Sequence, residues 1–438
     1  MATFDFIDYN ISMSKISTES YKGVRDFYPE EKFIQKHLFA AMRKTVESFG
    51  YVEYDASVLE PAELYRAKSG EEIVNEQTYT FTDRGDREVT LRPEMTPTVA
   101  RMVASRQHDL TFPLRWYSIP NLFRYEKPQR GRLREHWQLN VDMFGASGIS
   151  ADIELITVGY TLMKNLGATD TDFIIKVNSR TLMTDLFALF SLDDDQSHKT
   201  SKLLDRKNKI SESDFQTALN DIMGDNWKDF ERLITSQERL MEKLEHTDSA
   251  KEIITLLESL IRQGIKNVEF DPTIMRGFDY YTGIVFEFFD TSPENNRSLF
   301  GGGRYDDLLD MFGARKMPTV GFGMGDVTAQ DFLQTHNLLP AYQSSTDLFI
   351  CLLASEYEAH ADDLAKTLRT KGLNVAVNYS YKKIGDQIKV ADKQKVPYII
   401  AIGENEATSN TYTLKKLDTG EETRGDVDTI VSTIEAKK

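Results

Sequence analysis

The chain has 438 residues, of which 28% are charged, and its formal net charge at pH 7 is −16. That length suits two or three domains, and the acidic excess argues against a protein that coats nucleic acid by bulk positive charge. No apolar run approaches the roughly 18 residues of a membrane-spanning helix, the N-terminal segment lacks a signal or transit pattern, and Cys351 is the only cysteine, so we expect a cytoplasmic protein without an intramolecular disulfide and without a membrane partner.

Residues 21–145 predict antiparallel β structure. The stretch "REVTLRPEM" reads as a strand that ends at Pro93, and Glu94 and Thr96 follow it. A strand end could present such a carboxylate to an ammonium group, although an exposed loop glutamate is the common alternative. Two later stretches, "LRWYSIPNLFRYEK" and "HWQLNVDMFG", alternate apolar and polar residues like the arms of a hairpin, with Pro128 and Gly131 in the loop between them.

The second arm of this hairpin has two chemically different faces. Gln138, Asn140 and Asp142 follow one another at a spacing of two, so they share one face of a strand. The opposite face carries the apolar side chains of Trp137, Leu139, Val141 and Met143. If the apolar face supplies the core, the polar face is either solvated or lines a cavity.

A charged helical region then interrupts the β-rich sequence. Apolar residues recur at helical spacing in residues 151–166, and "DFIIKVNS" reads as a buried strand. Residues 181–264 predict successive amphipathic helices, one of which starts at a capping signature formed by Ser211 and Asp214. We interpret this region as a helical insertion, and its scattered basic residues favour a solvated surface over a nucleic-acid contact.

Glycine and aromatic residues mark the return to β structure. The stretch "MRGFDYYTGIVFEFFD" places Arg276 four residues before Tyr280 and Tyr281, a combination that suits a flat, anionic ligand better than a core. The strings "FGGGRYDDLL" and "TVGFGMGD" follow. In the second string glycines alternate at positions 321, 323 and 325, so a strand there has one bare face that accepts either a ligand or another packed backbone.

The last part of the chain predicts a separate α/β domain. We expect residues 1–335 to form the first domain and residues 336–345, with "NLLPAYQSS", to form a linker. Strand-like stretches follow, "DLFICLLA", "LNVAVNY", "YIIAIG" and "TYTLKKL", and helical stretches separate the first three. This alternation predicts a small, mostly parallel α/β domain over residues 346–438.

The motifs of several enzyme classes are missing from the sequence. It has no G-x-x-x-x-G-K-[ST], no G-x-G-x-x-G that opens a helix and no G-x-S-x-G, which argues against P-loop ATPases, Rossmann dehydrogenases and α/β-hydrolases. Arginine-bearing segments remain. In "FRYEKPQRGRLREHWQ", Arg124 lies on the predicted strand and shares its face with Glu126, either as a surface ion pair or in a phosphate site, and Arg132 lies in or beside the loop.

Four of these segments, in this order, resemble motifs of the histidyl-tRNA synthetases, a branch of the class II aminoacyl-tRNA synthetases: "LRPEMTPTVAR", "FRYEKPQRGRLREHWQ", "MRGFDYYTGIVFE" and "GGGRYDDLL". The resemblance runs from Gly23 to the end of the chain. It implies an α/β fold class, with an α+β catalytic domain on an antiparallel sheet, a helical insertion and a C-terminal α/β anticodon-binding domain. It also implies that the protein activates L-histidine with ATP and Mg²⁺ to histidyl-adenylate and pyrophosphate, and then transfers histidine to the 3′ end of tRNA(His).

The resemblance also assigns roles to individual residues. Arg276 and Arg124 would be the catalytic residues that stabilise charge at the α-phosphate. Histidine would be bound at its α-amino group by Glu94, Thr96 and Gln138, and at its imidazole by Asp142, Tyr281 and Tyr305. ATP would contact Arg124, Glu126, Arg132, Arg276, Gly323 and Gly325. No side chain is assigned to a metal ion.

Two positions depart from the family pattern. Thr328 stands where the third motif normally has an arginine over adenine, and Ser57 stands where motif 1 has a proline tied to the dimer interface. A homodimer is still expected. The missing arginine leaves open a non-catalytic paralogue, such as a regulatory subunit of ATP phosphoribosyltransferase, and a pure RNA-binding module is the other alternative.

Overall fold

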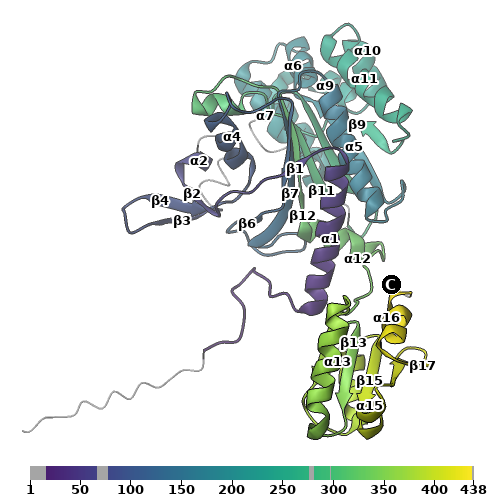
Figure 1. The fold of residues 1–438 in the computed structure, drawn as a ribbon. Helices are drawn as coiled ribbons and strands as arrows, with labels where there is room; N and C mark the ends of the chain where they lie inside the picture. Colours follow the sequence, from purple (N-terminus) through teal and green to yellow (C-terminus); the bar gives the residue numbers. More distant parts are fainter. Residues whose placement is uncertain (1–15, 67–76, 276–280, 296, 437–438) are drawn as a thin grey trace, which may run out of the picture. The chain divides into compact units, whose positions relative to one another are not determined.

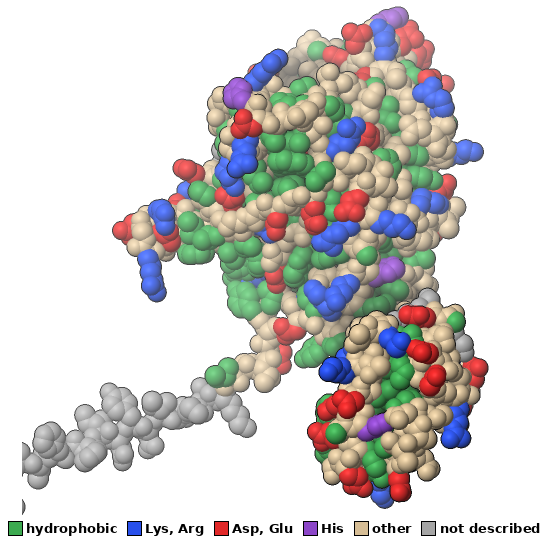
Figure 2. Space-filling model, in the orientation of Figure 1, with side chains coloured by type: hydrophobic (Ala, Val, Ile, Leu, Met, Phe, Trp, Pro, Cys, Tyr) green, Lys and Arg blue, Asp and Glu red, His purple; other side chains and the backbone are tan. Residues whose placement is uncertain are grey.

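The computed structural model describes residues 16–66, 77–275, 281–295 and 297–436. The chain divides into two compact units: unit 1 comprises Met1–Tyr28 and Gln35–Leu339, and unit 2 comprises Pro29–Ile34 and Pro340–Lys438. Figure 1 labels many of the elements of each unit, and Figure 2 shows acidic and basic side chains interspersed on the visible surface of both. Over the described ranges, no helix is long and apolar enough to cross a membrane.

Unit 1 is built on a mixed, mainly antiparallel sheet that has nine strands within the described residues. The order is β1-β5-β7-β12-β11-β10-β8-β9, and β6 pairs with β7 as well. The predicted hairpin is confirmed, because β5 and β6 both run antiparallel to β7. The strands are β1 (Val52–Glu53), β5 (Leu114–Ser118), β6 (Asn121–Phe123), β7 (Glu135–Phe144), β8 (Phe173–Ser179), β9 (Val268–Phe270), β10 (Ile284–Asp290), β11 (Ser298–Arg304) and β12 (Thr319–Gly325).

A second, three-stranded sheet of unit 1 has the order β2-β4-β3, with β2 at Leu59–Pro61, β3 at Tyr79–Thr82 and β4 at Glu88–Leu91. The short helix α2 (Glu63–Arg66) precedes β3, and α4 (Thr96–Ser105) follows β4. The predicted strand is therefore present but ends at Leu91, before Pro93. The sequence analysis does not predict α4. Pro97 fits in this helix because it stands in the first turn, where its missing N–H is not needed.

The two faces of the unit 1 sheet differ in the predicted way. Leu139, Val141 and Met143 of β7 are buried in the main hydrophobic core. The prediction is wrong for Trp137, which stays partly exposed and packs its ring edge-on against Phe27, with 5.4 Å between the ring centroids. Since β7 alternates, its polar residues lie on the face that the core does not occupy.

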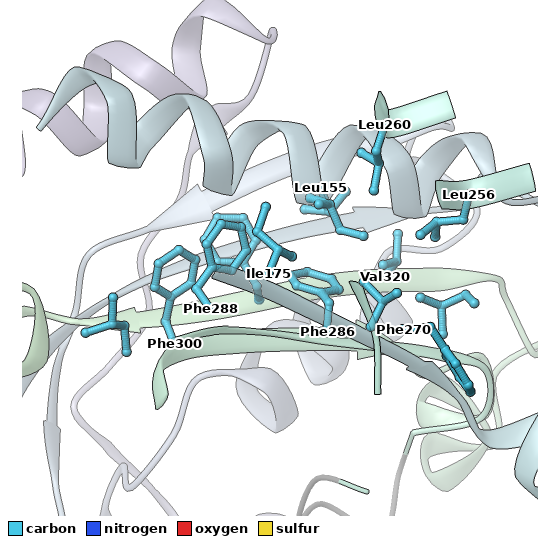
Figure 3. Packing of buried hydrophobic residues seen from close by; sticks show 14 of the residues in the cluster. Leu155, Ile175, Leu256, Leu260, Phe270, Phe286, Phe288, Phe300 and Val320 are labelled. Atoms are coloured by element: carbon cyan, nitrogen blue, oxygen red, sulfur yellow. The ribbon is translucent and has the colours of Figure 1, made fainter. Parts of the chain in front are cut away.

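Helices α5 (Ser150–Asn165) and α11 (Asp248–Arg262) cover the apolar face. Figure 3 shows Leu155 of α5 and Leu256 of α11 beside the aromatic side chains of the central strands. Among these, the rings of Phe288 and Phe300 stack with 4.2 Å between centroids. A fully buried side chain of this size contributes about 1.5–3 kcal/mol, so this layer holds the sheet from one side and leaves its other face available for a site.

The predicted helical region is confirmed between β8 and β9. It contains α6 (Arg180–Leu189), α7 (Asp194–Asp205), α8 (Glu212–Met223), α9 (Trp227–Ile234), α10 (Gln237–Leu244) and α11, with short 3₁₀ turns η1 (Lys207–Lys209) and η2 (Gly224–Asn226). The side chain of Ser211 caps α8 as predicted, accepting a hydrogen bond from the Asp214 backbone N–H at 3.1 Å. Unit 1 also contains α1 (Pro29–Ser48, from Gln35 on), η3 (Leu308–Phe312) and α12 (Asp326–Thr335).

Unit 2 has a five-stranded sheet with the order β14-β13-β15-β16-β17. The first three strands are parallel as predicted, whereas β16 and β17 are antiparallel additions at one edge. The elements are β13 (Leu348–Leu352), η4 (Ser355–Tyr357), α13 (Glu358–Thr370), β14 (Val375–Asn378), α14 (Ile384–Lys393), β15 (Tyr398–Ile402), α15 (Glu404–Ser409), β16 (Tyr412–Lys416), β17 (Glu422–Gly425) and α16 (Val427–Glu435). The expected α/β class is confirmed for both units together.

Candidate active site

A cavity of about 120 Å³ opens on the polar face of the unit 1 sheet. Most of its side chains come from β7 and from the segments next to β4, β6, β10 and β11, which the fold brings together from distant parts of the sequence. The cavity is lined by Glu94, Thr96, Arg124, Gln138, Asn140, Asp142, Tyr281, Gly301, Tyr305, Gly321, Phe322 and Gly323. Residues expected to bind the amino acid therefore lie around one cavity.

The floor of the cavity is a strip of glycines. The register of β12 places Gly321 opposite Asp142, Gly323 opposite Asn140 and Gly325 opposite Gln138. On the other side of β12, Gly301 and Gly303 of β11 stand opposite Gly323 and Gly321. A Cβ at Gly323 would overlap the Nε2 atom of Gln138, and a Cβ at Gly321 would overlap Asp142 and the Tyr305 hydroxyl. The bare face predicted from the alternating glycines therefore adjoins a cavity, and the space above it admits no side chain.

Asp142 lies at the closed end of the cavity. Its side chain is almost wholly buried, and the Tyr305 hydroxyl donates a hydrogen bond to Oδ1. The other oxygen, Oδ2, is buried and has no hydrogen-bond partner. Burial raises the pKa of Asp142 to about 7, and the hydrogen bond from Tyr305 opposes that rise. The pocket thus holds a carboxyl group that can gain or lose a proton near neutral pH and still has one acceptor oxygen to offer.

Two tyrosine rings form one wall. The rings of Tyr281 and Tyr305 meet edge to face, with 6.2 Å between centroids and 66° between planes. Tyr281 stands just before β10 and Tyr305 just after β11, which are neighbouring strands. Arg276, which the sequence analysis expects beside them, lies outside the described residues.

Glu94 and Thr96 are both buried where α4 begins, so the alternative of an exposed loop glutamate is wrong. Arg124 is tied to the same turn, because its Nε donates to the carbonyl of Pro93 at 2.8 Å. Across the cavity, Gln138 donates from Nε2 to Asn140 Oδ1 at 3.0 Å. The sequence analysis does not select Asn140 for the site, although it belongs to the same alternation as Gln138 and Asp142.

The arginine-rich loop lies beside the cavity. The prediction that Arg124 is part of a strand is wrong, because β6 ends at Phe123 and the chain turns into the loop. Glu126 lies between two arginines, with Oε1 at 4.0 Å from Arg124 Nη1 and Oε2 at 3.6 Å from Arg132 Nη1. Arg132 is 60% exposed and does not line the cavity. Together these groups offer two guanidinium forks and a carboxylate to a ligand that extends beyond the cavity.

The loop is fastened to helix α12. Arg130 Nε donates to Asp331 Oδ1 at 2.9 Å, and its Nη1 donates to the carbonyl of Glu294 at 3.0 Å. At the start of α12, Thr328 uses its hydroxyl to donate to the carbonyl of Leu299 at 2.9 Å. The Thr328 side chain is thus bonded to the protein backbone and presents no charge to the cavity.

Asp326, at the first position of α12, forms an ion pair with Arg25. It accepts hydrogen bonds from Arg25 Nη2 at 2.7 Å and from the Trp137 backbone N–H at 2.9 Å. Burial raises the pKa of Asp326, and Arg25 opposes the rise. Gly325 is the N-cap of α12 and stands outside the cavity lining.

One further ring lies on the cavity face of β7. His136 precedes Gln138 by two residues, and burial, with the nearby Arg124 and Arg25, lowers its pKa to about 3. A neutral imidazole therefore continues the row of polar side chains toward the loop. The sequence analysis misses it, although the spacing of two would have included it.

Known proteins resemble this chain in sequence and in fold. Residues 23–326 match the family described as histidyl-tRNA synthetase, and residues 347–437 match the family described as anticodon binding domain. The histidine–tRNA ligase of Leptospira biflexa serovar Patoc is 44% identical over 92% of this chain and 94% of that protein. The histidine–tRNA ligase of Thermoplasma volcanium is 36% identical over 92% of this chain and 95% of that protein.

Solved structures share the fold. The histidyl-tRNA synthetase from Nostoc sp. PCC 7120 has a TM-score of 0.83 at 23% identity, covering 97% of this chain and 100% of that one. A structure described as an ATP phosphoribosyltransferase regulatory subunit/histidyl-tRNA synthetase from Bacillus halodurans C has a TM-score of 0.73 at 25% identity, covering 89% of this chain and 99% of that one.

Proposed function

Because the chain belongs to the histidyl-tRNA synthetase family, we propose that the cavity of unit 1 binds L-histidine and that the arginine-rich loop beside it binds ATP. The chain is a histidine–tRNA ligase, an enzyme that uses ATP. One observation carries the proposal for the site: the side chains that the family resemblance selects for histidine line a single cavity, together with Arg124. They are Glu94, Thr96, Gln138, Asp142, Tyr281 and Tyr305.

The chemistry of these side chains suits histidine. A neutral imidazole has one donor nitrogen and one acceptor nitrogen. Asp142 Oδ2, buried without a partner, is the acceptor for the ring N–H, and the tyrosine rings form the wall against which the ring packs. At the mouth, the carboxylate of Glu94 and the oxygens of Thr96 and Gln138 suit an ammonium group. A site built to hydrogen-bond a ring rejects apolar analogues, because they would leave Asp142 buried and unpaired.

Arginine residues carry the chemical step. An oxygen of the histidine carboxylate attacks the α-phosphorus of ATP, the new O–P bond replaces the bond to the β-phosphate oxygen, and pyrophosphate leaves. Arg124, which lines the cavity and donates to the Pro93 carbonyl, is proposed to stabilise the charge that develops at the α-phosphate. Arg276 is proposed for the same role from the sequence alone, and Arg132 and Glu126 for the nucleotide.

Mg²⁺ belongs to the proposal through ATP. Among the described residues, no group of three His, Cys, Asp or Glu side chains could hold a metal ion. The ion would therefore depend mainly on phosphate oxygens, as Mg²⁺ often does, and would neutralise part of their charge. Arg124 and Arg132 are proposed to orient those phosphates.

The second half of the reaction involves tRNA(His). The terminal ribose hydroxyl of the tRNA attacks the carbonyl carbon of the adenylate, and AMP leaves. Unit 2, which matches the anticodon binding domain, is proposed to hold the anticodon, and residues 346–438 are proposed as its bounds. The arginine-rich loop, with Arg132 exposed, is a candidate for the acceptor end.

Two alternatives, a non-catalytic paralogue and a pure RNA-binding module, agree less well with the relatives and with the cavity. A non-catalytic paralogue was favoured by Thr328, yet the curated relatives that cover more than nine-tenths of the chain are ligases. A pure RNA-binding module does not explain a buried cavity lined by polar side chains.

A homodimer in the cytoplasm completes the proposal. β1 is an edge strand of the unit 1 sheet, and large hydrophobic side chains of this unit are exposed, among them Val52 of β1, Leu59 of β2 and Phe81 of β3. Figure 2 shows hydrophobic side chains exposed in patches on this unit. Exposed apolar surface and an open strand edge both favour association with a second copy. Light scattering after gel filtration tests this, and a monomer at micromolar concentration would contradict it.

Exchange of labelled pyrophosphate into ATP tests the site. Purified protein, Mg²⁺ and ATP are incubated with each amino acid in turn. We expect exchange with histidine alone, its loss in Arg276→Ala, and a raised KM for histidine in Tyr305→Phe. Exchange that persists in Arg276→Ala, or a Tyr305→Phe variant with the wild-type histidine KM, would remove the assigned roles.

A further inference from the structure

Arg304 ends β11 on the face of the sheet opposite to the cavity. Its neighbours along the chain, Gly303 and Tyr305, belong to the cavity side, so the Arg304 side chain points toward α5. Nε donates to Asp152 Oδ1 at 3.2 Å, and Nη2 donates to Asp152 Oδ2 and to the carbonyl of Gly148 at 3.0 Å. Asp152 is fully buried, and Arg304 is 8% exposed.

This pair is more than a contact between two side chains, because Arg304 also fixes backbone on both sides of it. Its carbonyl accepts a hydrogen bond at 2.7 Å from the N–H of Thr282, the residue that follows Tyr281. Its aliphatic stem lies over Gly283, where a Cβ would stand 3.0 Å from Arg304 Cδ. The segment that carries Tyr281 into the cavity is therefore held against Arg304.

The second tyrosine is held by the residues that follow. Tyr305 donates its N–H to the carbonyl of Thr319 at 2.8 Å, and Asp306 accepts from the Thr319 N–H at 2.9 Å. Asp306 also donates its N–H to the Thr282 hydroxyl at 3.1 Å, which ties the two segments together. Arg304 Nη1 reaches Asp306 Oδ1 at 3.5 Å. Arg304 thus bonds to this short network through its carbonyl and through the contact of its guanidinium group with Asp306, and Asp152 holds the same guanidinium group from the other side.

We propose that Arg304, clamped by Asp152, is a positioning residue for the histidine pocket, because it fixes the backbone that aims Tyr281 and Tyr305 at the bound side chain. The inference rests on the proposed histidine pocket. A planar fork that donates to Asp152 and to a carbonyl at once cannot be reproduced by the single ammonium group of lysine. The hydrogen bonds described for Arg304 do not reach Arg124 or Glu126, so we expect its replacement to affect ATP binding much less than histidine binding.

The test is Arg304→Lys in histidine-dependent pyrophosphate exchange, with thermal unfolding measured on the same samples. We expect the KM for histidine to rise by about tenfold or more while the KM for ATP stays within about twofold, since misplacement by an ångström costs such factors in a preorganised site. Asp152→Asn keeps an acceptor and the volume but removes the charge, and a smaller rise in the histidine KM is expected.

The chain offers a matched control on the same helix. Arg115 of β5 binds Glu154 of α5 through Nε at 2.7 Å and Nη2 at 2.9 Å, and neither residue lines the cavity. Arg115→Lys is expected to leave both KM values unchanged, whatever it costs in stability. A general effect of loosening α5 would instead appear in this variant as well and would overturn the positioning role.

The outcomes separate this inference from the pocket assignment. Unchanged histidine KM in folded Arg304→Lys, or an equal rise in both KM values, overturns the inference. If Tyr305→Phe raises the histidine KM and Arg304→Lys does not, the positioning role of Arg304 is refuted and the histidine pocket stands. If neither variant raises the histidine KM, the assignment of the pocket to histidine is refuted. Should Arg304→Lys not fold, Asp152→Asn is judged by the same criteria.

Discussion

Replacing Asp142 by asparagine removes a titrating group from the closed end of the cavity while keeping its size. The wild-type carboxyl has its pKa raised from 3.8 to about 7 by burial. Between these two values the folded protein holds a proton that the unfolded chain has already lost. The raised pKa of Asp142 therefore contributes to the free energy of unfolding. This contribution is complete below the unfolded pKa and is lost as the pH rises through about 7.

The magnitude follows from that window. Each unit of pKa difference corresponds to about 1.4 kcal/mol, so the two pH units from about 5 to 7 remove about 2.7 kcal/mol of wild-type stability. The amide of the variant cannot ionise, so the variant does not share this loss. We expect the Asp142→Asn protein to gain about 2–3 kcal/mol relative to the wild type between about pH 5 and pH 8.

Urea unfolding followed by tryptophan fluorescence measures this difference, because Trp116, Trp137 and Trp227 are the only tryptophans and all belong to unit 1. Tyr305→Phe is the companion variant. Losing its hydrogen bond raises the pKa of Asp142 further, so the loss of stability moves to higher pH. A difference between Asp142→Asn and wild type that is the same at both pH values would refute the reasoning, since it would mean that the buried carboxyl does not titrate there.

Three other predictions concern a glycine of the cavity floor, a hydrogen bond of Thr328 and the packing of the core. Gly323→Ala is expected to raise the histidine KM at little cost in stability, because the new methyl group would push away the Nε2 end of the flexible Gln138 side chain. Gly385→Ala, in the open surroundings of α14, is the control and is expected to leave the histidine KM unchanged and to be neutral or stabilising by up to about 1 kcal/mol. Thr328→Val is expected to cost about 1 kcal/mol in thermal unfolding and to leave the ATP KM within about twofold, since its hydroxyl bonds only backbone carbonyls; a large change in that KM would mean that the hydroxyl faces the nucleotide. Phe288→Ala, in the stacked core, is expected to cost about 3–5 kcal/mol in urea unfolding, and a cost below about 1 kcal/mol would contradict the packing in Figure 3.

Local patterns in the sequence predict much of the fold. The alternation in β7 separates a core face from a cavity face, and the capping residue Ser211 marks the start of α8, because both signals act within a few residues. Predictions fail where tertiary packing decides. Trp137 has the apolar character of its face but stands where β7 leaves the core. Arg124 stands one residue beyond the end of β6, although its backbone N–H still donates to the Arg134 carbonyl at 2.9 Å.

The site is less predictable than the fold, because its geometry depends on register. The sequence shows alternating glycines and alternating polar residues, but nothing local states that Gly321 stands opposite Asp142. The clamp between Arg304 and Asp152 joins residues far apart in the chain, and neither has an unusual neighbourhood in the sequence. His136 belongs to a visible alternation, yet only its burial beside Arg124 marks it as part of the same row.

The glycine strip has a consequence for the protein without its substrates. On the core side, β11 and β12 are packed by a full layer of side chains, whereas on the cavity side Gly301, Gly303, Gly321 and Gly323 contribute none. The side chains of Gln138, Asp142 and Tyr305 reach over these glycines instead, and under the proposed function a bound amino acid would pack beside them. If the cavity binds histidine as proposed, the amino acid would add to the stability of unit 1, since a ligand at about a hundred times its Kd adds about 2.7 kcal/mol. Unit 1 would then be most stable when its site is filled.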